Sequence, residues 1–196
     1  QQTGTYEDNI RAIKNVIESC VNDIDDIDSM PLFDVEYIFL QLRIKSIGSI
    51  VEPTIVCPET GESISIELDL TKIKATTNEK HTNKIKINDN VMITMKYPTI
   101  RTIENEEEID YNDPEKFYDL VVNCIERIDT NEETIDVEML PKKELEDFLD
   151  NMNKKQFENI LEFFLTSPKL YHEVKYTTSD GVERELVLQG ISDFLE

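Results

Sequence analysis

The order of elements that the pattern predicts in the first half of the chain is repeated in the second half. In each half, an amphipathic helix with one cysteine precedes further helix and then a hairpin with glycine at its tip. Cys20 and Gly61 mark this order in the first half, and Cys124 and Gly181 mark it in the second. Two copies are too few for a solenoid, which needs about three or more stacked units. The sequence therefore predicts an α+β fold with pseudo-twofold character.

The hydrophobic periodicity predicts helices packed on short antiparallel hairpins. We expect an N-terminal helix–hairpin half over 1–98, an acidic linker over 99–114 and a C-terminal helix–hairpin half over 115–196, either separate or packed as one domain. An acidic loop is expected over 129–138, and His81 is expected in a polar loop. The predicted helices are 6–22, 31–45, 115–128, 141–151, 153–166 and 191–195; the predicted strands are 50–57, 62–70, 84–87, 91–97 and the two arms of a final hairpin at Asp180-Gly181.

If the halves are duplicated, Gly61 should superpose near Gly181 and Cys20 near Cys124. The second half is longer between these landmarks by about one helix and a short loop, which fits its additional helical pair. Both cysteines should be buried against the helix at 34–46. The residues expected to contribute to the core are Tyr37, Phe39, Leu40, Phe163 and Phe164.

The charge of the chain restricts its partners. The sequence has 42 acidic and 20 basic residues and a formal net charge of −22. This charge repels nucleic acid and anionic membrane surfaces and favours basic partners, although a bias in overall composition explains it equally well. No run reaches the ~18 apolar residues of a membrane span. We therefore expect neither a nucleic acid nor a membrane as partner.

The three cysteines, Cys20, Cys57 and Cys124, form no even or paired framework, which indicates a reducing, intracellular setting. The start at Gln1 shows no signal-peptide pattern, and its lack of methionine suggests that residues preceding it were removed or omitted.

The sequence contains no recognisable catalytic or cofactor motif. It has two histidines and five glycines, and it has no phosphate-binding loop, nucleophile elbow or zincin motif. The acidic run from Asp23 to Asp28 lacks the glycine and the late glutamate of a calcium loop, so a solvated loop is favoured. We therefore predict no catalytic, cofactor-binding or metal-binding residues, and we predict that the protein is not an enzyme.

The turn Cys57-Pro58-Glu59-Thr60-Gly61 resembles the tip of a zinc ribbon, in which two thiolates hold one ion. Thr60 occupies the position of the second thiolate, and His81 and His172 are distant in sequence. A metal-free turn is therefore favoured over zinc, and a metalloprotein with a degenerate ribbon is the hypothesis that elemental analysis would test.

The segment Phe33-Asp34-Val35-Glu36-Tyr37-Ile38-Phe39-Leu40-Gln41-Leu42-Arg43-Ile44-Lys45-Ser46-Ile47-Gly48 resembles a helix of the baseplate hub subunit of T-even-type contractile-tailed bacteriophages. Later segments are also similar to that family. They are Met95-Lys96-Tyr97-Pro98, the helix from Gln156 to Phe164, Pro168-Lys169-Leu170 and the ending from Leu188 to Leu195.

This resemblance implies a late viral protein that is made in the cytoplasm of the infected bacterial host and acts in assembly of the baseplate hub. Its partners would be other hub or tape-measure proteins, and it would either remain in the virion tail baseplate or leave as a chaperone. Some relatives carry Cys-x-x-Cys-Gly-like turns where this chain has Thr60 and Thr177, which again argues against a ribbon metal. The alternative is an acidic nucleic-acid mimic that inhibits a DNA-binding enzyme.

Overall fold

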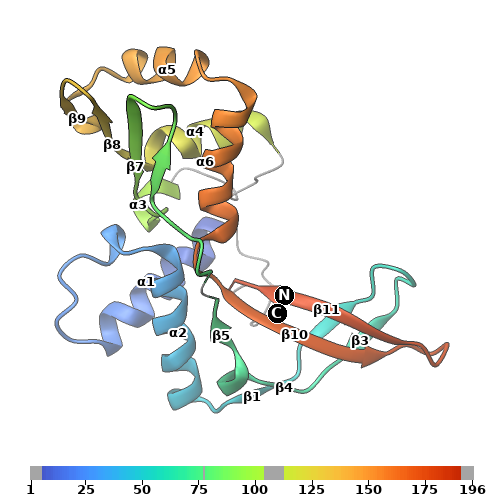
Figure 1. The fold of residues 1–196 in the computed structure, drawn as a ribbon. Helices are drawn as coiled ribbons and strands as arrows, with labels where there is room; N and C mark the ends of the chain where they lie inside the picture. Colours follow the sequence, from blue (N-terminus) through green and yellow to red (C-terminus); the bar gives the residue numbers. More distant parts are fainter. Residues whose placement is uncertain (1–5, 77, 104–112, 191–196) are drawn as a thin grey trace. The chain divides into compact units, whose positions relative to one another are not determined.

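The computed structural model describes residues 6–76, 78–103 and 113–190, and it confirms the α+β class (Figure 1). The chain forms two compact units that interleave along the sequence. Unit 1 comprises Gln1–Arg11, Asp26–Leu32 and Thr77–Ser167, and unit 2 comprises Ala12–Asp25, Phe33–Thr76 and Pro168–Glu196.

Unit 1 is built on a four-stranded antiparallel sheet in the order β6-β7-β8-β9. The strands are β6 (Lys84–Lys86), β7 (Val91–Met95), β8 (Ile125–Thr130) and β9 (Thr134–Asp136); the helices are η1 (Ile27–Ser29), α3 (Ile100–Ile103), α4 (Pro114–Cys124), η3 (Val137–Met139), α5 (Lys142–Asp150) and α6 (Lys154–Thr166). One face of the sheet and helices α4, α5 and α6 enclose a single apolar cluster. Its most buried members include Ile93, Val121, Cys124, Ile160 and Phe163.

Local side-chain hydrogen bonds explain where the unit 1 helices begin. Asp113 accepts hydrogen bonds from the backbone N–H groups of Glu115 and Lys116 in α4, and Pro114 is the first residue of that helix. Asn153 and Gln156 form a reciprocal capping box at the start of α6. These caps satisfy backbone donors that have no partner inside the helix.

Unit 2 contains two long helices and three small antiparallel sheets. The helices are α1 (Tyr6–Cys20), which begins in unit 1, α2 (Leu32–Ser46) and the short η2 (Leu70–Lys72); the strands are β1 (Ile50–Val51), β2 (Thr54–Val56), β3 (Ser63–Ser65), β4 (Leu68–Asp69), β5 (Lys74–Ala75), β10 (Leu170–Thr177) and β11 (Glu183–Gln189). The pairs are β1 with β4 and β2 with β3, and the third sheet has the order β11-β10-β5. Both hairpin turns contain glycine with positive φ, 70° at Gly61 and 78° at Gly181.

The predicted first hairpin is interrupted. The first arm divides into β1 and β2 at Pro53, which has no N–H to donate to a ladder, and the second arm divides into β3 and β4. The carbonyl of Pro53 instead accepts a hydrogen bond of 3.0 Å from Ile66 N.

The helix predicted over 115–128 is wrong in its last turn. Helix α4 ends at Cys124, and Ile125 begins strand β8, in register with Met95 of β7. The acidic stretch 129–138 is also more than a loop, because it contains the end of β8, strand β9 and most of η3. Short apolar runs fit a helix or a buried strand, and here pairing with β7 selects the strand.

The burial predicted for the two helix cysteines is half correct. Cys124 is buried, but in the core of unit 1 and not against the 34–46 helix, which belongs to unit 2. Cys20 is exposed. The two cysteines therefore lie in different surroundings, which removes one of the landmarks of the duplication.

The prediction of core residues is correct for most of the five side chains. Leu40, Phe163 and Phe164 are buried and Phe39 is half-buried, whereas Tyr37 is 43% exposed, so that prediction is wrong. Most of the predicted linker 99–114 and the predicted helix 191–195 lie outside the described residues, although α3 occupies the start of the linker.

Candidate functional site

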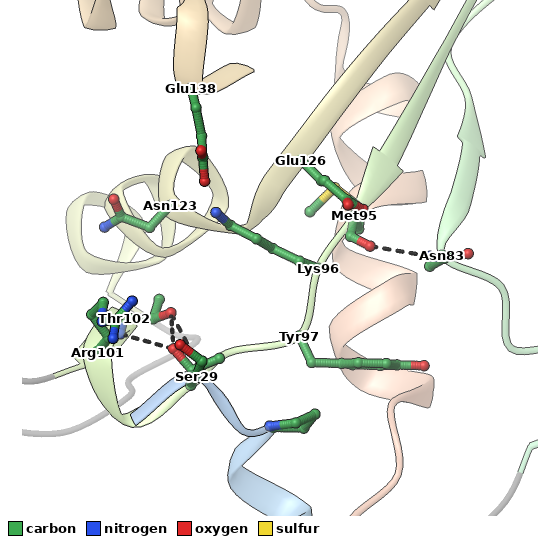
Figure 2. A pocket seen from close by; sticks show the side chains of 12 residues that line it. Ser29, Asn83, Met95, Lys96, Tyr97, Arg101, Thr102, Asn123, Glu126 and Glu138 are labelled. Atoms are coloured by element: carbon green, nitrogen blue, oxygen red, sulfur yellow. Dashed lines mark hydrogen bonds between the residues drawn. The ribbon is translucent and has the colours of Figure 1, made fainter. Parts of the chain in front are cut away.

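Unit 1 contains an open hollow of about 700 Å³ where strand β7 ends (Figure 2). Backbone hydrogen bonds on both sides fix the strand end at this place. Met95 N donates to Asn83 O, and Lys96 N donates to Cys124 O, each at 2.8 Å. The side chains that line the hollow come from η1, β7 and its continuation, α3, α4, β8 and η3: Ser29, Pro31, Asn83, Met95, Lys96, Tyr97, Thr99, Arg101, Thr102, Asn123, Glu126 and Glu138.

Lys96 supplies a cationic group to this hollow. Figure 2 shows its side chain extending toward Asn123 and Glu138, with Glu126 on the neighbouring strand. In the described part of the chain, the ammonium group forms no ion pair within 4.0 Å. An ammonium group can donate hydrogen bonds to a carboxylate or carbonyl oxygen of a ligand.

The opposite wall is held by an internal network around Asp26. Asp26 accepts hydrogen bonds from the hydroxyl of Ser29 at 2.6 Å and from the guanidinium of Arg101 at 3.0 Å. The Ser29 hydrogen bond and, after it, the charge of Arg101 hold the pKa of Asp26 below its usual value. Thr99 and Thr102 add reciprocal hydrogen bonds beside it. This wall offers a preformed polar surface.

The hollow combines hydroxyl, amide, carboxylate and ammonium groups with the apolar surfaces of Met95 and Tyr97. Its one serine is hydrogen-bonded to a carboxylate, and no histidine lines the hollow. The carboxylate beside Ser29 is that of Asp26, and its lowered pKa makes it a weak proton acceptor for activating a nucleophile. A mixed polar and apolar surface of this kind suits recognition of a polypeptide segment.

His81 is packed more tightly than the sequence suggests. Its ring stacks on Tyr97 and Phe163, with ring centroids 5.7 and 5.3 Å apart. Nδ1 lies 2.9 Å from Thr166 Oγ1, and Nε2 lies 2.8 Å from Tyr97 Oη. Burial lowers the pKa of His81. Both ring nitrogens are thus engaged by hydroxyl groups, and the histidine acts as part of the packing.

In unit 2 the structure brings together the two turns that the sequence singles out. The Glu62 carboxylate accepts hydrogen bonds from the N–H and hydroxyl of Ser179, at 2.9 and 3.0 Å. The Arg184 guanidinium donates to Glu59 at 3.0 Å and to both carboxylate oxygens of Asp180, at 2.9 and 3.0 Å. The hydrogen bonds from Arg184, and a further one from the hydroxyl of Thr178, lower the pKa of Asp180. Local sequence pattern did not indicate this role for Arg184, because its partner Glu59 lies 125 positions away.

Cys57, at the start of the first turn, is buried. Hydrogen bonds from Thr60 and Tyr176 lower the pKa of its thiol to about 7. Thr60, the residue that replaces the second ribbon cysteine, thus stabilises the thiolate of the first. Within residues 6–76, 78–103 and 113–190, no three His, Cys, Asp or Glu side chains are grouped so that they could hold a metal ion.

Within the acidic run Asp23–Asp28, Asp26 makes local interactions with the backbone. The Asp26 carboxylate also accepts a hydrogen bond from Asp28 N and caps η1, and Asp23 adopts a positive φ of 65°.

Among the described residues, no helix combines the length and apolar character that a bilayer span requires.

The chain is thus an α+β protein with an open hollow in which polar, charged and apolar groups lie side by side. The family described as T4 bacteriophage base plate protein matches residues 1–196, and the chain therefore belongs to this family of phage baseplate proteins. No curated protein and no solved structure matches the chain. The resemblance to a phage baseplate protein is thus confirmed at the level of the family.

Proposed function

We propose that this baseplate protein is a non-enzymatic component or assembly chaperone of the central hub, and that it binds other hub or tape-measure proteins. The observation that carries the proposal is the family match over the whole chain. The hub-like segment Phe33–Gly48 supports the finer assignment, since residues 33–46 of it form most of the regular helix α2.

The structure adds a place at which such a partner could bind. Met95, Lys96 and Tyr97, from the hub-like segment Met95–Pro98, line the hollow of unit 1. A partner segment would supply a carboxylate or carbonyl oxygen to Lys96 and apolar atoms to Met95 and Tyr97.

The distribution of charge gives the acidic mimic little support. On α5 and α6, carboxylates pair with lysines four positions away, as in Lys142–Glu146 and Lys154–Glu158. Such interleaved charges are typical of solvated helix faces and do not produce the uniform acidic stripe of a nucleic-acid mimic.

Deletion of the gene from the phage tests the proposed role directly. We expect tails without completed baseplates in infected cells, visible by negative-stain electron microscopy, and restoration by a plasmid copy. Normal plaques from a clean deletion would refute the assembly role.

A Lys96→Glu variant tests the hollow. It should fail to restore baseplates, whereas Lys143→Glu should restore them, because Lys143 lies on the exposed surface of α5 and does not line the hollow. The two variants are matched, since both replace a lysine by a glutamate. Equal rescue by both variants would remove the hollow from the proposal. Mass spectrometry of purified virions then distinguishes a retained component from a released chaperone.

A further inference from the structure

Strand β11 stands at the end of the strand order in its sheet and has β10 as its neighbour on one side (Figure 1). It pairs with β10 over seven residues without a register shift, from Glu183 to Gln189. The edge strands of the unit 1 sheet, β6 and β9, have three residues each. An edge of seven residues is long enough to template another strand.

The direction of the backbone groups on β11 follows from the hydrogen bonds at both ends of the hairpin. Thr178 N donates to Val182 O at 3.2 Å, and Gly190 N donates to Leu170 O at 3.1 Å. In an antiparallel pair, hydrogen-bonded residues alternate with residues whose groups point away. The even-numbered residues of β11 therefore face β10, and Glu183, Glu185 and Val187 direct their N–H and C=O groups outward.

This edge carries charged side chains, at Glu183, Arg184 and Glu185, but it lacks several other features that commonly protect an edge strand. Such features are lysine, proline, a bulge or a very short strand. Strand β6 is short and carries Lys84 and Lys86. Strand β11 contains neither lysine nor proline, and the guanidinium of Arg184, its one basic group, is held by Glu59 and Asp180.

The side chains along the edge define what could pair with it. Glu183 and Glu185 are exposed on one face, and Val187 on the same face is 40% exposed. Lys175 on β10 forms an ion pair of 2.9 Å with Glu185, so the cross-strand position already selects a lysine. Opposite charges on adjacent strands stabilise a sheet, and like charges destabilise it.

We propose that the outer edge of β11 accepts an extended strand from a partner protein, in which lysine or arginine alternates with β-branched apolar residues. The basic side chains face Glu183 and Glu185 on one face of the sheet, and the apolar ones pack on the half-buried Leu186 on the other face. Main-chain hydrogen bonds supply affinity, and the alternating side chains supply specificity. This inference rests on the proposed function, since it states how a hub partner is held.

The test uses the full chain and a synthetic peptide, acetyl-Lys-Val-Lys-Ile-Lys-Val-Thr-amide, followed by site-resolved amide hydrogen exchange. Amides of Glu183, Glu185 and Val187 should exchange about tenfold or more slowly with the peptide bound, because each gains a hydrogen-bonded state. The inward amides of Leu186 and Leu188 are protected already and should change little. A peptide N-methylated at alternate residues keeps the side chains but cannot pair, and it should not bind.

Two variants add a test from the side of the protein. Val187→Pro removes an outward donor and keeps the inward hydrogen bonds, so peptide affinity should fall about tenfold or more. Glu183→Lys should weaken binding, whereas Glu67→Lys, an exposed change of the same charge elsewhere in unit 2, should not. If Val187→Pro also makes the inward amides exchange faster, the variant has disturbed the hairpin itself. The comparison of Glu183→Lys with Glu67→Lys and the methylated peptide then test whether the edge binds a strand.

Unchanged exchange at the three outward amides, or equal binding of the methylated peptide, overturns the strand-pairing inference. Neither result depends on the phage. Normal plaques after gene deletion would instead overturn the hub role, so the two failures are distinguishable.

Discussion

Replacement of Phe163 by alanine should destabilise unit 1 selectively. Phe163 is 1% exposed and lies at the centre of the apolar cluster of that unit. Its ring centroid is 5.3 Å from that of His81, 5.4 Å from that of Tyr97 and 5.0 Å from that of Phe164. Alanine would leave a cavity bordered by these three rings.

The expected loss follows from burial and packing. A buried phenylalanine replaced by alanine costs about 3–5 kcal/mol of unfolding free energy, from lost apolar transfer and from the residual cavity. Aromatic contacts of this kind contribute about 0.5–1.5 kcal/mol beyond area burial, which places Phe163→Ala in the upper part of that range. Leu165→Ala is the matched control on the same helix, because Leu165 is 57% exposed and should change stability by less than about 0.5 kcal/mol.

The assay must resolve the two units, since a chain of this organisation need not unfold in one step. Urea-dependent amide hydrogen exchange should show the loss at β7 and β8 of unit 1 and a much smaller change at β10 and β11 of unit 2. A loss below about 1 kcal/mol at β7 and β8, or a loss equal to that of Leu165→Ala, would refute the packing argument.

Other predictions follow from single interactions. Asn153→Ala removes the capping box of α6 and should cost about 1 kcal/mol in urea unfolding; an unchanged midpoint would contradict it. Gly181→Ala should lower the free energy of unfolding by about 1–2 kcal/mol in the same assay, because alanine is strained at a φ of 78°. The loss comes from the backbone alone, since a Cβ there meets no atom within 4 Å. The lowered pKa of His81 means that its stabilising contribution is present above its ordinary pKa of 6.5 and is lost as pH falls below it; His81→Gln should reduce this loss, and identical pH profiles would exclude it. The Cys57 thiol should titrate near pH 7 by ultraviolet absorbance, and Thr60→Val should move the midpoint toward 9.0; a wild-type midpoint already near 9.0 would rule out the hydrogen-bond effect.

The site could be predicted from the sequence only in part. The turns at Gly61 and Gly181 were identified from local pattern, and the segment Met95–Pro98 was identified by its resemblance to the baseplate hub family. Met95, Lys96 and Tyr97 of that segment line the hollow of unit 1. The mutual contact of the two turns and the role of Arg184 could not be predicted, because the ion pair with Glu59 joins residues 125 positions apart.

The sequence by itself determined the features that depend on near neighbours. Asp113 with Pro114, Asn153 with Gln156 and the glycine turns act through hydrogen bonds and dihedral preferences within a few residues. Helix starts and hairpin tips were therefore predictable.

Tertiary structure decided where α4 gives way to β8 and which cysteine is buried. Ile125 fits a helix or a strand equally well by periodicity, and only its pairing with Met95 selects the strand. Cys20 and Cys124 have similar local patterns, yet Cys124 is enclosed by strands and helices from distant parts of the chain, whereas Cys20 remains exposed. Burial and strand pairing depend on groups far apart in sequence, so local pattern alone cannot fix them.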